Sequence, residues 1–99
     1  VEFENAEIDD TAISYDANSQ KVLITYQDIG NSNYGTAIVG TVSGTSISFG
    51  TATVFKSAAT FKHASVYDPD SQKIIIASGQ NSASLVMLWH MTQIQIELL

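Results

Sequence analysis

Two short segments of the chain carry oxygen-bearing side chains at alternating positions. The segments are "DANSQ" and "DPDSQ", with Asp16, Asn18 and Gln20 in the first and Asp68, Asp70 and Gln72 in the second. Alternating oxygen ligands open the calcium-binding loop of EF-hand proteins, in which these side chains face one ion. Calcium is therefore the only cofactor that the sequence suggests, with these candidate ligands: Asp16, Asn18, Asp68 and Asp70.

The remainder of each segment does not fit a calcium loop. An EF-hand loop needs glycine at its sixth position, where this chain has Lys21 and Lys73, and glutamate at its twelfth, which neither segment has. Asp and Asn are also typical of tight turns, because their side-chain oxygens accept hydrogen bonds from the backbone two residues on. We therefore predict two β-turns and assign no metal site.

Other groups that bear charge or could bind metal are weaker candidates. Five carboxylates crowd the first ten residues: Glu2, Glu4, Glu7, Asp9 and Asp10. They could line a cation site, but such a run is more often a solvated edge that keeps a strand from stray pairing. His63 and His90 lack cysteine partners and HExxH spacing, so a zinc site would need ligands from other chains. We predict a solvated edge and, for His63, an ordinary histidine at a strand end.

Signatures of catalysis and of nucleic-acid binding are missing from the sequence. There is no cysteine, no G-x-S-x-G elbow and no GK[ST] phosphate loop. The net charge is −6 and all four basic residues are lysines, which argues against a phosphate-rich partner. The longest apolar stretch, "LVMLWHM", is too short to span a bilayer. We predict a protein that is not an enzyme and that binds neither nucleic acid nor membrane.

The segments that would position the candidate residues all have strand patterns. "TAISYD" is short and β-prone, "KVLITYQ" is apolar on both faces, and "YGTAIVGTV" is a third strand after the loop "DIGNSN". "SGT" is a turn into "SISFGTATVF", where Ile47 and Phe49 alternate with serines as in a half-buried strand. Helical periodicity is absent from this part of the chain, so we predict an all-β fold.

The pattern occurs twice, at a spacing of 52 residues. "ISYDANSQKVLIT" is matched by "SVYDPDSQKIIIA", and the alignment runs without a gap from Phe3, which falls on Phe55, to Ile24, which falls on Ile76. Repeats of this length are typical of solenoids and propellers, and four strands in about 50 residues describe a propeller blade. We predict two four-stranded antiparallel blades, residues 1–55 and 56–99.

The segments "YD.DSQKV.I.Y.D" and "GTAIVGTVSGTSISFG" resemble tandem β-propeller blades of viral tail or cell-surface adhesion proteins. The resemblance covers about Glu2 to Gln80 and implies a propeller fragment of metagenomic or viral origin, in an extracellular or virion-associated setting. Its motifs are turns and strands, so it implies no functional residue. Tyrosines could stack on sugars, and the candidates are Tyr15, Tyr26, Tyr34 and Tyr67. Tyr15 and Tyr67 recur with the blade, which favours a packing role for these two.

The second copy departs from the pattern from about residue 81. One interpretation is divergence, with "SLVMLWH" and "TQIQIELL" still serving as the third and fourth strands. The other is a shift of reading frame, because one possible set of codons for "AYDPDS", read one base out of frame, encodes "HMTQI", the string that begins at His90. In that case Trp89 and His90 are not a site.

Two stacked blades would bury one interface and leave two apolar outer faces in water, and such faces usually mark interaction surfaces. Propellers close into rings of 4–8 blades, so two, three or four copies of this chain would complete one. We predict a homo-oligomer and favour a trimer with six blades, because a closed ring avoids open-ended growth. The alternative is a monomeric β-sandwich.

Two functions follow from this architecture. The first is a non-catalytic structural or binding module that assembles with itself and grips a glycan or another protein through its loops. The second is a fragment of a propeller glycoside hydrolase or lyase, in which Asp16 and Asp68 would act as paired carboxylates. Symmetric copies would place both in like environments, whereas an acid and a base need different pKa values, and the sialidase type also needs arginines. We favour the first.

Overall fold

The computed structural model describes residues 2–80 and 92–98, with side chains for residues 2–79. The strands are β1 (Ile8–Asp16), β2 (Lys21–Asp28), β3 (Tyr34–Ser43), β4 (Ser46–Phe49), β5 (Thr53–Asp68), β6 (Lys73–Gln80) and β7 (Thr92–Leu98). One 3-10 helix, η1 (Ile29–Asn31), lies in the segment that we expected to be a loop. The predicted all-β class is confirmed. Within the described residues no helix is long and apolar enough to cross a membrane.

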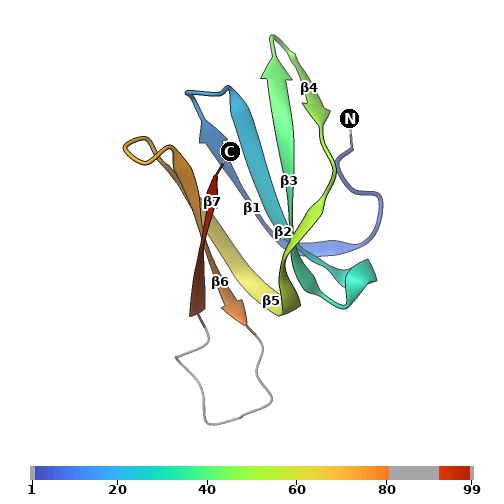
Figure 1. Cartoon of the computed structure of the whole chain (residues 1–99). Helices are drawn as coiled ribbons and strands as arrows, with labels where there is room; N and C mark the ends of the chain where they lie inside the picture. The colour runs from blue at the N-terminus through green and yellow to red at the C-terminus, as the bar shows by residue number, and fades with distance from the viewer. Residues whose placement is uncertain (1, 81–91, 99) are drawn as a thin grey trace.

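The strands form one antiparallel sheet in the order β1-β2-β3-β5-β6-β7, with β4 paired to the second half of β3. The long strand β5 has two neighbours: up to Ala59 it pairs with β3, and from Thr60 it pairs with β6. The sheet curves round on itself, which brings β5 next to β1 and nearly closes it (Figure 1). The boundary that we expected between residues 55 and 56 therefore falls inside one continuous strand.

The central strand β2 is buried on both faces, as its apolar run predicts. One core cluster lies on the side that faces β6 and consists of Leu23, Ala37, Ile74 and Ile76, with Val39, Phe55 and Tyr67 packed against it. The other lies on the opposite side and consists of Ile24, Tyr26 and Ile38, with Phe3, Ile8 and Phe49 packed against it. The sheet is therefore covered on one side by its own second half and on the other by the N-terminal segment and β4.

Aromatic side chains close the second cluster. The ring of Phe3 lies 5.5 Å from that of Tyr26 and 6.0 Å from that of Phe49. Gly40 makes this packing possible, because a Cβ there would lie 2.8 Å from Ile47 and 2.9 Å from Phe49. The predicted alternation in β4 is confirmed, with Ile47 and Phe49 half-buried between exposed serines.

The C-terminal segment takes a different place from the one predicted. Thr92–Leu98 pairs directly with β6, as β3 pairs with β2, so it occupies the position of a third strand and not of a fourth. Its register also differs, since Lys21 pairs with Thr41 but Lys73 pairs with Leu98. The segment "SLVMLWH", with Trp89 and His90, lies outside the described residues. The reading-frame interpretation stays a hypothesis about the coding DNA.

Candidate functional site

Two β-hairpins of matched geometry form the structural centre of the chain. The first hairpin is β1–β2, and the second is the later half of β5 with β6. The strand ends pair as Asp16 with Lys21 and as Asp68 with Lys73, each across a four-residue turn. The last turn residue is left-handed in both, with φ of 58° at Gln20 and at Gln72. The two turns thus have the same backbone form, 52 residues apart.

A β-bulge interrupts each hairpin at the same place. The register shifts between Asp9 and Ala12 in β1 and between Phe61 and Ala64 in β5. Each bulge has one non-glycine residue with positive φ, Asp10 at 49° and Lys62 at 56°. A bulge bends its strand and increases the local twist, so both hairpins curve alike. Neither bulge was predicted from the sequence, because neither contains a glycine, the residue that most often marks a positive φ.

The first turn is held by its aspartate, as predicted. Oδ1 of Asp16 accepts hydrogen bonds from the backbone amides of Asn18, at 2.8 Å, and of Ser19, at 3.3 Å. Oδ2 accepts one from the Ser19 hydroxyl at 2.7 Å. The carboxylate oxygens are thus committed to the turn, and Asn18 contributes its backbone while its side chain is exposed.

The second turn repeats this arrangement. Oδ1 of Asp68 accepts from the amide of Asp70 at 3.0 Å, and Oδ2 accepts from the Ser71 hydroxyl at 2.9 Å. These contacts favour the turn interpretation of both motifs over the calcium loop. Within the part of the chain that the structure describes, no group of three or more His, Cys, Asp or Glu is placed to hold a metal ion.

Because opposite residues of an antiparallel pair point to the same side, each hairpin has two named faces. In the first hairpin, the Tyr15 face carries Ile13, Tyr15, Val22 and Ile24, and the Asp16 face carries Ser14, Asp16, Leu23 and Thr25. In the second hairpin, the Tyr67 face carries Ser65, Tyr67, Ile74 and Ile76, and the Asp68 face carries Ala64, Val66, Asp68 and Ile75. At the 52-residue spacing, the Tyr67 face corresponds to the Tyr15 face and the Asp68 face to the Asp16 face.

Inside the chain, the Tyr67 face packs against the Asp16 face. On the apolar side of this contact, Leu23 lies in one core cluster with Ile74 and Ile76. On the other side, the hydroxyl of Tyr67 lies beside the Asp16 carboxylate, and each of the two groups shifts the pKa of the other. The second hairpin thereby covers the first turn, and Asp16 is only 3% exposed.

The contact changes the proton affinity of both partners. Burial raises the pKa of Asp16, but hydrogen bonds from the hydroxyls of Ser19 and Tyr67 and from the backbone outweigh burial and hold the pKa below its ordinary value. Burial, and then the hydrogen bond to Asp16, raise the pKa of Tyr67. The pair is therefore a carboxylate and a neutral phenol at neutral pH, suited to hydrogen bonding and not to proton transfer.

His63 lies between the hairpins and not at a strand end, which corrects the prediction. It sits next to the bulge in the middle of β5, where its Nε2 is 2.7 Å from the Thr60 hydroxyl and its ring stands edge-on to Phe55. Burial lowers its pKa, an effect that the charge of Asp10 and the backbone of Thr25 only partly offset. A buried neutral imidazole in this place packs the interface.

Part of the interface between the hairpins is polar and unsatisfied. Four buried atoms have no hydrogen-bond partner among the described residues: Ser14 Oγ, Thr25 Oγ1, His63 Nδ1 and Ser65 Oγ. Buried polar atoms without partners reduce stability. The hydrogen-bonded contacts that fix the two hairpins are thus concentrated elsewhere, at Asp16 with Tyr67 and at Thr60, whose carbonyl accepts from Gln27 at 2.6 Å.

The acidic N-terminal residues do not converge on one point. Glu4 accepts from the amides of Asn5 and Ala6 and from the hydroxyl of Tyr26. Burial, followed by the charges of Glu4 and Asp28, raises the pKa of Tyr26 to about 12. Tyr26 is a fully buried core residue, so packing explains it.

The faces that point away from the internal contact remain open in part. On the Tyr15 face, Ile13 is 61% exposed and Tyr15 is 49% exposed, and on the Asp68 face Val66 is 60% exposed. Neighbouring exposed apolar side chains, such as Ile13 and Tyr15, are features of interaction surfaces. The sequence predicted apolar outer faces but did not identify which residues stay open. Comparison with protein-family models, curated proteins and solved structures finds no match for this chain.

Proposed function

We propose that this protein is a non-catalytic structural module that assembles with copies of itself. The observation that carries the proposal is the exposure of Ile13, Tyr15 and Val66 on the outward faces of two matched hairpins. Each hairpin has apolar side chains on both faces, yet only one face of each meets the other hairpin. A second copy would remove the remaining apolar side chains from water.

The bound state of the carboxylates supports a non-catalytic role. Asp16 is buried and accepts hydrogen bonds from one hydroxyl and two amides, so it is poorly placed to act as a nucleophile or a base. Asp68 serves the same structural purpose in its own turn.

Blade-like repetition supports a closed ring as the form of the assembly. The two hairpins have equivalent turns and bulges, and each is extended by a further strand, β3 or β7. If each is one blade, three copies give the six-bladed ring that we favour, and two or four copies give rings of four or eight. Ring closure satisfies every outward face at once.

The test is the solution mass of the protein, measured by light scattering during size-exclusion chromatography at several salt concentrations. We expect a discrete oligomer, a trimer in the favoured case, at micromolar protein. Salt should screen the repulsion between chains that each carry −6. A monomer at every concentration and salt would overturn the proposal and leave a folded single chain.

A further inference from the structure

We propose that the second copy docks head to tail, with its Tyr15 face on the Asp68 face of the first copy and its Tyr15 hydroxyl on the Asp68 carboxylate. This inference rests on the proposed self-assembly and names the surface that carries it. Both faces belong to described residues, and each has exposed apolar side chains: Ile13 and Tyr15 on the Tyr15 face and Val66 on the Asp68 face.

The chain itself contains the template for this contact. The Tyr67 face already packs against the Asp16 face, and the two open faces are the counterparts of these two at the 52-residue spacing. The geometry is matched where it matters, since the turns share φ of 58° and the bulges fall at equivalent positions. A backbone that fits the Asp16 face can therefore fit the Asp68 face with little change.

Within the described residues, Asp68 and Tyr15 on the outward faces lack the contact that their counterparts Asp16 and Tyr67 make with each other. Asp16 and Asp68 have equivalent contacts within their turns, but Asp16 has the additional Tyr67 hydroxyl and is buried. Asp68 is only half-buried, and Tyr15 is 49% exposed. The surfaces that would meet thus carry one tyrosine hydroxyl and one carboxylate that can accept a further hydrogen bond besides those of its turn.

The part of each face that is already covered is also equivalent. Phe3 packs on the first hairpin against Ile24 and Tyr26, and its counterpart Phe55 packs with the cluster of Ile76. In both hairpins the phenylalanine covers the part of the face that is far from the turn and leaves the residues next to the turn uncovered. In the second hairpin that free part, with Tyr67, meets the Asp16 face. In the first hairpin it consists of Ile13 and Tyr15, which stay exposed among the described residues.

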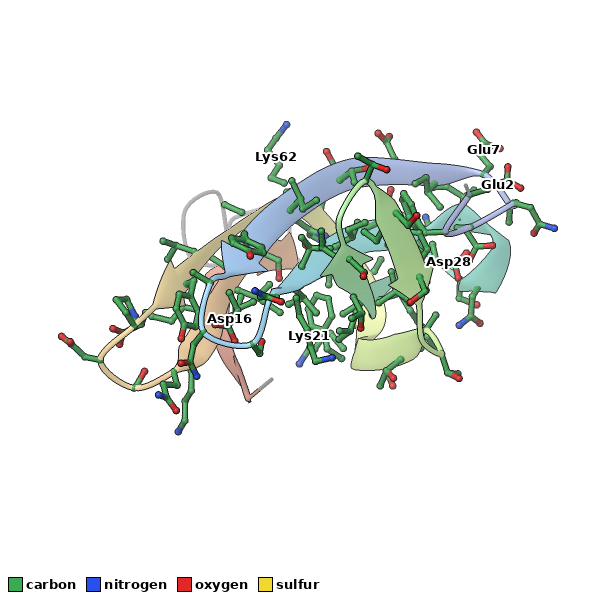
Figure 2. All side chains as sticks on the ribbon, turned by 90° about the horizontal axis from the view of Figure 1, so that it is seen from above. Glu2, Glu7, Asp16, Lys21, Asp28 and Lys62 are labelled. Atoms are coloured by element: carbon green, nitrogen blue, oxygen red, sulfur yellow. The ribbon has the colours of Figure 1, made fainter. Side chains whose placement is uncertain are left out.

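Charge favours this pairing over contact between two like faces. Lys73 pairs with Asp68 and so lies on the Asp68 face, and Lys62, the counterpart of Asp10, lies in the bulge of the same hairpin; these are two of the four basic residues of the chain. Lys62 extends away from the sheet, and Glu2 and Glu7 lie near the start of β1, the strand that presents the Tyr15 face (Figure 2). Lysines of one copy would therefore approach the acidic N-terminal segment of the next.

Such a contact is heterologous, because different faces of the two copies meet. Each copy keeps one free Tyr15 face and one free Asp68 face, so the chain of contacts continues until it closes into a ring. A heterologous contact can therefore be distinguished by experiment from a contact between identical faces.

The experiment uses two single variants, each with a charge in one open face. Ile13→Asp should block the Tyr15 face and Val66→Asp should block the Asp68 face, and both sites are exposed enough for the monomer to fold. We expect each variant alone to be monomeric in light scattering. An equimolar mixture should give a heterodimer and nothing larger, because one good Tyr15 face and one good Asp68 face remain.

The matched control is Asn18→Asp, which adds the same charge to an exposed turn position where the second hairpin already has aspartate. It should keep the oligomer of the unaltered chain, and circular dichroism should show all three variants folded. If the unaltered chain oligomerises but the mixture stays monomeric, or if either variant keeps the full oligomer, the head-to-tail contact is wrong while self-assembly stands. If the unaltered chain is monomeric, the proposed function fails first.

Two subtler variants test the hydrogen bond. Tyr15→Phe and Asp68→Asn should each weaken association about tenfold, the usual magnitude for a hydrogen bond to a charged group. Because they remove the same contact, the double variant should lose little more than either single variant. Additive losses would overturn the assignment of Tyr15 to Asp68.

Discussion

The two hairpins have the same backbone and different surroundings. In the first, β2 is covered on both sides, and its residues from Val22 to Tyr26 are all buried. In the second, β6 alternates: Ile74 and Ile76 are fully buried, whereas Ile75 and Ala77 are only half-buried. The sequence of β6 is nonetheless as apolar as that of β2. The comparison teaches that two equally apolar strands are buried unequally, because the described residues cover β2 on both sides and β6 on one.

The aspartates of the two turns give the same lesson in polar groups. Both close their turns through a backbone amide and a serine hydroxyl. Only Asp16 has a tyrosine from another hairpin above it. Local sequence therefore fixes the turn, and the neighbouring hairpin decides whether the carboxylate is buried.

The largest expected effect is a difference in unfolding free energy between substitutions on the two sides of β6. Ile76→Ala should lower the free energy of unfolding by about 2–5 kcal/mol, because it leaves a cavity in the core cluster with Leu23. Ile75→Ala, on the half-open Asp68 face, should cost about 1 kcal/mol or less in the monomer. Urea denaturation at low protein concentration measures both. Equal losses would mean that the Asp68 face is covered within one chain.

The turns should differ in the next experiment. Asp16→Ala should lower the melting temperature clearly more than Asp68→Ala does, since it also removes the acceptor of the Tyr67 hydroxyl from a buried place. Thermal unfolding of dilute samples, followed by circular dichroism, compares the two. If Asp68→Ala is as damaging in the monomer, the tyrosine contact adds nothing and the comparison fails.

Replacing a buried hydroxyl by an apolar group, as at the equivalent position of the second hairpin, should stabilise the first hairpin. Thr25 is fully buried with an unpartnered hydroxyl, and its counterpart in the second hairpin is Ala77. Thr25→Val keeps the shape and removes the unsatisfied group, so it should raise the free energy of unfolding by about 1 kcal/mol. A loss of stability in urea titrations would show that the hydroxyl has a partner after all.

The smallest effect is a pH dependence at His63. Its pKa is lower in the folded chain than in the unfolded one, so the unfolded state binds more protons as the pH falls toward and below 6.5. Stability should therefore be complete at neutral pH and decline between about pH 7 and 5. His63→Thr introduces the residue type found at the equivalent position, Thr11, and should reduce the decline in stability. An unchanged slope in urea midpoints would assign it to other groups.

Much of the fold was predictable from short-range signals. The turns at Asp16 and Asp68 follow from Asx chemistry, and the burial of β2 follows from its continuous apolar run. The bulges at Asp10 and Lys62 were not predictable, because positive φ is uncommon at non-glycine residues and neither bulge contains a glycine. The place of β7 beside β6 was also missed, since strand pattern does not specify a pairing partner.

The sequence by itself determined the strands, the turns and the presence of apolar residues on both faces of each hairpin, because these depend on residues close together in the chain. Only the tertiary structure decided which faces meet. Curvature of the sheet brings the Tyr67 face onto the Asp16 face and leaves Ile13, Tyr15 and Val66 in water. Burial is a property of what lies opposite a side chain in space. Tyr15 and Tyr67 are the same residue type in equivalent positions, and only their neighbours differ.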